Sequence, residues 1–137
     1  MRMLIVEDNP GDVSLFREAL HEIGYPSLIS VVGDGIEAIA SLRLGLLDSG
    51  IDLMVLDLNL PHKSGREVLA EMKSDPDLRD IPIAILTSST IDCDIVKRFN
   101  LEPGAYFIKP LEFNEYIEVV RSIIEFGQER QVQHNSS

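Results

Sequence analysis

The chain has 137 residues, 45% of them hydrophobic, so it can bury one sizeable core and leaves little room for a second domain. Acidic residues outnumber basic ones by 23 to 12, and the formal charge of -11 argues against binding to nucleic-acid phosphates or to an anionic membrane. The lone cysteine excludes an intramolecular disulfide, and no segment approaches the roughly 18 apolar residues of a membrane span. We expect a cytoplasmic protein with one domain over residues 1–127 and a disordered tail over residues 128–137.

Apolar runs of strand length alternate with segments of helical period. In chain order, strands are expected over residues 3–6, 28–32, 53–56, 83–86 and 105–108. A helix is expected after each strand, with apolar faces that include, in turn, Phe16 and Leu20, Ile36 and Ile39, Leu69 and Met72, Ile91 and Ile95, and Tyr116 and Val120. Asn9, Asp34 and Ser64 stand where the first three of these helices need a capping side chain.

The strand runs are apolar throughout and do not alternate with polar residues, which is typical of strands covered on both faces of a parallel sheet. Five strand–helix repeats predict an open, doubly wound α/β sheet with five helices and right-handed crossovers. Ligands of such sheets bind beyond the carboxyl ends of the strands, so the functional residues should lie there.

Polar residues with complementary chemistry follow four of the strands. Glu7 and Asp8 follow the first strand, Asp57 the third, Thr87 the fourth and Lys109 the fifth. Carboxylates brought together raise one another's pKa unless cations compensate them, and oxygen ligands without a His or Cys cluster suit a hard ion such as Mg²⁺. Taken singly, each residue can equally be a turn, a helix cap or a solvated side chain. If these residues were unrelated helix caps, there would be no reason to find an acid pair, a single acid, a hydroxyl and a lysine at successive strand ends. A magnesium site is therefore the favoured interpretation.

Five motifs, LIVEDN, DGIEA, LMVLDLNLPHKSG, IAILTSS and AYFIKP, resemble the receiver domain of two-component response regulators over residues 3 to about 125. The resemblance implies a flavodoxin-like sheet with strand order 2-1-3-4-5. It implies that the chain is a phosphoprotein and that Asp57 is its phosphoacceptor, which takes a phosphoryl group from a phosphohistidine of a sensor histidine kinase. Thr87 and Lys109 would hold the phosphoryl oxygens.

The resemblance also assigns a metal site. It implies that Mg²⁺ is held by Asp8, by Asp57 and by the backbone carbonyl of Asn59, with Glu7 acting mainly through coordinated water. Thr87 and Tyr106 correspond to the switch residues of the family.

A cis peptide bond is implied between Lys109 and Pro110, which would aim the lysine into the site.

Several sequence segments, including SDPDLRDIPI and FNEYIEVVRSIIEF, resemble the small regulators that serve bacteriophytochrome-type kinases. Leu111 departs from the family, in which phenylalanine usually follows this proline. Val119, Ile123 and Phe126 form a second apolar stripe on the last helix, and we interpret it as the interface of a homodimer. The alternative is a broad apolar face that the chain's own tail covers.

Two other classes of function use a similar fold or a similar set of residues. A Mg²⁺-dependent phosphohydrolase that forms an aspartyl phosphate generally needs a second aspartate two residues after the nucleophile, where this chain has Asn59. A binding module that works without phosphorylation is disfavoured because the acids, Thr87 and Lys109 are all present. We expect a protein that is no turnover enzyme and loses its own phosphoryl group slowly, at a rate tuned by Asn59 and Ser89. Its partners would be the kinase and a downstream protein target.

Overall fold

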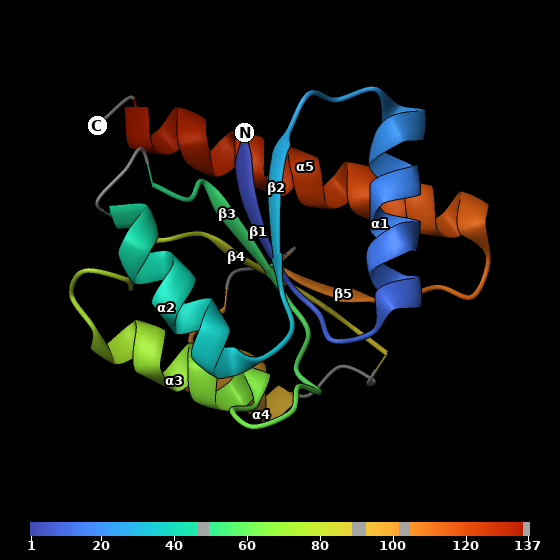
Figure 1. Ribbon diagram of the computed structural model, residues 1–137. Helices are drawn as coiled ribbons and strands as arrows, with labels where there is room; N and C mark the ends of the chain where they lie inside the picture. Colours follow the sequence, from blue (N-terminus) through green and yellow to red (C-terminus); the bar gives the residue numbers. More distant parts are fainter. Residues whose placement is uncertain (47–49, 89–92, 102–104, 136–137) are drawn as a thin grey trace.

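The structure is a computed structural model that describes residues 1–46, 50–88, 93–101 and 105–135. Five parallel strands form one sheet in the order β2-β1-β3-β4-β5, as predicted (Figure 1). They are β1 (Arg2–Val6), β2 (Leu28–Val32), β3 (Leu53–Leu56), β4 (Ile83–Thr87) and β5 (Tyr106–Ile108). The central strands β3 and β4 are buried along their whole length, which confirms that the uninterrupted apolar runs are strands covered on both faces.

Helices cover both faces of the sheet (Figure 1). They are α1 (Pro10–Ile23), α2 (Gly35–Leu46), α3 (Gly65–Ser74), α4 (Cys93–Arg98) and α5 (Phe113–Asn135). Side chains of α1 and α5 form one core cluster with the sheet, and side chains of α2 and α3 form the other. Ile91, which was expected in the fourth helix, lies outside the described residues. In the described ranges, no helix combines the length and apolarity that crossing a membrane requires.

The predicted caps of the first three helices are confirmed. The side-chain oxygen of Asn9 accepts hydrogen bonds from the backbone N–H groups of Gly11 and Asp12, at 2.8 and 3.2 Å. Asp34 and Ser64 each accept one from the backbone three residues further on, at 2.8 and 3.2 Å. These contacts satisfy N–H groups that a helix start leaves without partners, and they fix where each helix begins relative to the preceding strand.

The register of the central strands brings the acidic residues to one level. Val6, the last residue of β1, is paired with Val32 on one side and with Leu56 on the other. The backbone N–H of Glu7 donates to the carbonyl of Val32 at 3.0 Å, and that of Asp57 donates to the carbonyl of Val6 at 3.1 Å. The first acid after β1 and the acid after β3 are therefore held side by side by the sheet itself.

The start of α3 packs directly on the backbone that carries Asp57. A Cβ atom added to Gly65 would lie 2.4 Å from the carbonyl oxygen of Asp57 and 2.6 Å from the Cα of Leu58. Both distances are far below van der Waals contact, so only glycine allows this approach. The backbone of Asp57 and Leu58 is therefore in close contact with the start of α3, which restricts how Asp57 can move.

The predicted disorder of residues 128–137 is wrong for most of the tail, because α5 continues to Asn135. The guanidinium of Arg130 lies over the ring of Phe126 at 4.6 Å, which ties the extra turns to the buried part of the helix. Glutamine, glutamate and arginine also have good helix propensity, so a lack of apolar pattern there did not imply a lack of helix.

The predicted dimer stripe on α5 is also wrong, because its side chains belong to the core of the same chain. The side chain of Ile123 is 0% exposed, Phe126 is buried, and Val119 packs partly buried against the same cluster. A Cβ on Gly127 would come within 3.0 Å of a methyl group of Leu53, so this part of α5 lies tightly on the sheet. The helix crosses one face of the sheet (Figure 1) and buries a wider face than a rim helix would.

Candidate functional site

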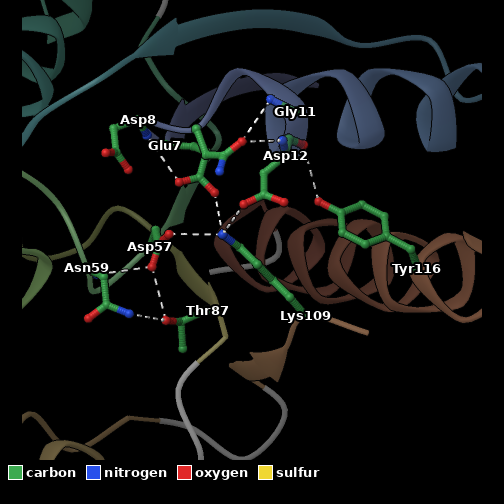
Figure 2. A network of polar contacts seen from close by, with 10 residues as sticks. Glu7, Asp8, Gly11, Asp12, Asp57, Asn59, Thr87, Lys109 and Tyr116 are labelled. Atoms are coloured by element: carbon green, nitrogen blue, oxygen red, sulfur yellow. Dashed lines mark hydrogen bonds and ion pairs between the residues drawn. The ribbon is translucent and has the colours of Figure 1, made fainter. Parts of the chain in front are cut away.

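Asp57 lies at the carboxyl edge of the sheet, and the described residues that contact its carboxylate come from other strand ends or from its own loop (Figure 2). Its Oδ1 accepts hydrogen bonds from the backbone N–H of Asn59 and from the hydroxyl of Thr87, both at 3.0 Å. Its Oδ2 lies 2.9 Å from the Nζ of Lys109. The side chain is buried, so this ammonium and these donors replace the water that a free carboxylate would bind.

Lys109 is surrounded by carboxylates. Its Nζ donates to Glu7, to Oδ2 of Asp12 at 2.9 Å and to Oδ2 of Asp57, and its side chain is only 11% exposed. Burial by itself would lower the pKa of this lysine, but hydrogen bonds to the three acids, Asp12 foremost, raise it well above the usual value. Lys109 is therefore a permanent cation.

The pKa values of the neighbouring carboxyl groups of Glu7 and Asp57 are shifted in opposite directions. Burial, and next the hydrogen bond with Asp57, raises the pKa of Glu7 from 4.5 to about 8. Burial also disfavours ionisation of Asp57, but hydrogen bonds from Glu7, Asn59 and Lys109 outweigh it and lower the pKa of Asp57. In the absence of a metal ion, the raised pKa of Glu7 and the lowered pKa of Asp57 favour a proton on Glu7 and a negative charge on Asp57.

Carboxylate oxygens of Glu7, Asp8 and Asp57 all lie within 4.8 Å of one another. Asp8 is exposed, and its backbone N–H donates to the second oxygen of Glu7 at 3.1 Å. The raised pKa of Glu7 shows that Glu7 and Asp57 are too deeply buried and too close together to be ionised at once without further positive charge. A hard divalent cation would supply that charge and would take oxygen atoms as its ligands. The residues present therefore fit a divalent metal ion, and Figure 2 shows Asp8 at the edge of the site.

Asn59 and Thr87 are part of the same network of hydrogen bonds. The side-chain amide of Asn59 donates to the hydroxyl of Thr87 at 3.4 Å, and that hydroxyl donates to Asp57. Thr87 is fully buried at the end of β4. The role of the Asn59 carbonyl as a metal ligand stays a prediction, and Ser89 lies outside the described residues.

Asp12 was missed by the sequence analysis. It lies in the first turn of α1, and an acid there is ordinarily explained by the helix dipole. Its contact with Lys109 joins residues 97 positions apart. One signal could have revealed it: α1 starts directly after the acid pair, so its first turn must lie at the same edge as the strand ends.

The predicted cis bond between Lys109 and Pro110 is wrong, since none of the peptide bonds in the described ranges is cis. A trans bond is the intrinsically favoured form even before proline. In this form the lysine still reaches all three carboxylates. Tyr106, the predicted switch aromatic, is half-buried and packs against the core cluster on the α2 and α3 side.

The raised pKa of Glu7 predicts a pH dependence of stability in the metal-free protein. A raised pKa in the folded state stabilises fully below pH 4.5, and this contribution is lost as the pH rises towards 8. The shifts of Asp57 and Lys109 act near pH 3.8 and above pH 10.5, outside this window. The free energy of unfolding, measured with urea, should therefore fall between about pH 5 and pH 8.

The matched control is Glu7→Gln, which keeps the hydrogen-bonding shape of a protonated acid and should flatten this part of the profile. Adding Mg²⁺ to the wild type should restore stability at pH 8, because an ionised Glu7 then meets a cation. A wild-type profile that rises over this range, or a Glu7→Gln profile of equal slope, would contradict the assignment of the proton to Glu7.

Parallel strands in the order 2-1-3-4-5, with an aspartate, a lysine and an acid pair at one edge, make up the architecture of a signal-receiver domain. Comparison with known families agrees, because the response regulator receiver domain matches residues 3–121. The chain belongs to this family.

Three relatives show which regulators it is similar to. Response regulator Rcp1 of Synechocystis sp. is 35% identical over 127 residues, covering 90% of this chain and 86% of Rcp1. The probable methanogenesis regulatory protein FilR2 of Methanothrix harundinacea is 36% identical, covering 90% and 81%. The crystal structure of the phosphorylated cyanobacterial phytochrome response regulator RcpA has a TM-score of 0.79 at 40% identity, covering 93% of each chain. The Mn²⁺-bound form of Rcp1 has a TM-score of 0.76 and covers 91% of this chain.

Proposed function

We propose that this chain is a response regulator whose receiver domain accepts a phosphoryl group on Asp57 from a sensor histidine kinase. The observation that carries the proposal is the placement of Asp57, a buried and ionised carboxylate that is hydrogen bonded to both Thr87 and Lys109. An anionic nucleophile with a cation and a hydroxyl beside it is what transfer of a phosphoryl group requires.

In the proposed reaction, a carboxylate oxygen of Asp57 forms a bond to phosphorus while the N–P bond of the phosphohistidine breaks. The electron pair of that bond stays on the imidazole, and an acyl phosphate remains on the chain. Lys109 already lies 2.9 Å from Asp57, so its ammonium can donate to a phosphoryl oxygen after a small displacement. Phosphoryl transfer depends mainly on the positioning of the reacting groups and on the neutralisation of charge. Asp57 provides the positioned nucleophile, and Lys109 provides the positive charge.

Glu7, Asp8 and Asp57, together with the carbonyl of Asn59, would hold Mg²⁺. When bound, the ion would supply positive charge that offsets the negative charge of the phosphoryl oxygens. The protein contributes the ligands from two adjacent strand ends, whose spacing the sheet fixes.

The hydroxyl of Thr87 is the proposed switch. It now donates to Oδ1 of Asp57 at 3.0 Å. A phosphoryl group on Asp57 would offer this donor a more strongly charged acceptor, and the end of β4 would move with the threonine. Tyr106, half-buried on the neighbouring strand β5, is the proposed second switch residue.

The kinase is proposed to be of the phytochrome type, on the strength of the likeness to RcpA and the sequence segments shared with such regulators. A downstream protein target, a cytoplasmic location and a homodimer remain part of the proposal. If a dimer forms, its surface is not the buried stripe of α5. The phosphohydrolase alternative is disfavoured, because Asn59 directs an amide at Thr87 where a hydrolase needs a carboxylic acid.

The test is incubation of the wild-type protein with acetyl phosphate and Mg²⁺, followed by intact-mass measurement. We expect a gain of one phosphoryl group per chain, which disappears when EDTA replaces Mg²⁺. Repeated turnover of a phosphate monoester would favour the hydrolase. A protein that takes up no phosphoryl group from either acetyl phosphate or a phosphorylated histidine kinase would be a binding module instead.

A further inference from the structure

Asp12 is the third carboxylate on Lys109, and its backbone is held on both sides. Its N–H donates to the capping side chain of Asn9 at 3.2 Å. Its carbonyl oxygen lies 3.5 Å from the hydroxyl of Tyr116 on α5, a long contact that Figure 2 shows beside the site. Asp12 therefore approaches Lys109 from a rigid helix start, independent of the strand ends that carry the other acids.

The ammonium group of Lys109 has three N–H donors, and three carboxylates take them. Under the proposed function, on which this inference rests, two of the three have further roles. Asp57 gains the phosphoryl group, and Glu7 belongs to the acid cluster that fits a metal ion. Asp12 lies outside that cluster, so its carboxylate alone is free to stay on Lys109 throughout the reaction.

Exposure also distinguishes Asp12 from the other two acids. Its side chain is 27% exposed, against 7% for Glu7 and 8% for Asp57. Water screens a partly exposed charge, so Asp12 repels an incoming phosphoryl group less than a buried acid would. It can hold the lysine at moderate electrostatic cost.

We propose that Asp12 is a positioning residue that anchors the ammonium of Lys109 while the donor facing Asp57 turns to the phosphoryl group. Only one of the three contacts of Lys109 then has to exchange. Two other roles are conceivable for an acid in this place: a competitor that holds the lysine away from the phosphoryl group, and a first-turn acid that only stabilises α1. The three roles predict different phosphorylation rates.

The test compares the initial rate of phosphorylation by acetyl phosphate at saturating Mg²⁺. Asp12→Asn, which removes the charge and keeps the shape, should be about tenfold slower than wild type, because an unanchored lysine is misplaced. Asp12→Ser, which keeps a good helix start, should be slowed similarly. Asp12→Glu, which keeps a carboxylate on a longer arm, should recover part of the rate. Glu18→Gln, an exposed acid on the same helix, controls for the change in net charge.

A double-mutant cycle tests whether Asp12 acts through the lysine. In a Lys109→Met background, Asp12→Asn should cause no further slowing, because the group it positions is gone. A readout without phosphorylation is hydrogen exchange of the Lys109 ammonium in the metal-free protein, followed by NMR. Exchange should be faster in Asp12→Asn, whereas loss of a purely structural acid would leave it unchanged.

The outcomes separate the inference from the proposed function. If the wild type takes up no phosphoryl group, the proposed function fails. If the wild type is phosphorylated and Asp12→Asn matches it, the helix-dipole role is correct. A faster Asp12→Asn would assign Asp12 as a competitor. Slowing that persists in the Lys109→Met background would show that Asp12 acts on something other than the lysine. Each of the last three results overturns the positioning role.

Discussion

Asp57→Asn is expected to take up no phosphoryl group from acetyl phosphate or from a phosphorylated kinase. An amide nitrogen or oxygen lacks the negative charge that makes the carboxylate a nucleophile, so the step that forms the acyl phosphate is lost. The substitution is nearly isosteric and leaves Glu7, Asp12 and Lys109 in place. Intact-mass measurement, with thermal unfolding of the same samples, distinguishes lost chemistry from lost folding.

Asp77→Asn is the matched control, since it makes the same chemical change at an exposed site beyond α3. It should be phosphorylated like the wild type. An Asp57→Asn protein that still gains a phosphoryl group would show that a neighbouring acid is the acceptor, and peptide mapping would identify whether it is Glu7 or Asp8.

The sheet and the centre of the site could be predicted from the sequence because both follow from local patterns. Each strand is a short apolar run, and in four of the five a functional side chain stands at the end of the run or directly after it. The position along the chain therefore already gives the position along the strand. Parallel pairing then brings these ends to one edge whatever the details of packing. The caps at Asn9, Asp34 and Ser64 were predictable for a similar reason, since a cap acts within three residues.

The features that the sequence did not give correctly depend on how helices lie on the sheet. The contact of Asp12 with Lys109 requires α1 and the end of β5 to meet. The order of the elements puts the first turn of α1 at the edge of the strand ends, but the packing of α1 on the sheet decides which of its side chains reaches the lysine. The stripe of Val119, Ile123 and Phe126 has the period of an exposed second face, yet α5 is turned so that this face meets the sheet. The spacing of apolar residues in the sequence predicts two apolar stripes on α5, but tertiary packing determines how much of each stripe is buried.

Ile123→Asp is therefore expected to unfold the protein instead of producing a folded monomer. The side chain of Ile123 is 0% exposed within the core cluster of α1, α5 and the sheet. Loss of a buried isoleucine side chain costs about 2 to 5 kcal/mol, and a carboxylate without a partner in that core adds a further penalty. The sum is comparable with the 5 to 15 kcal/mol that stabilises a typical domain. Circular dichroism should show a loss of helical signal at 25 °C and no cooperative thermal transition.

Leu111→Asp is the control, because this leucine is fully exposed, at 103%, on the segment after β5. It introduces the same charge outside the core and should change the free energy of unfolding by no more than about 0.5 kcal/mol. Sedimentation of this variant also reports on any dimer that uses the exposed surface around Leu111. An Ile123→Asp protein that keeps its cooperative transition would mean that α5 is rotated away from the orientation described, and the stripe would again be available as an interface.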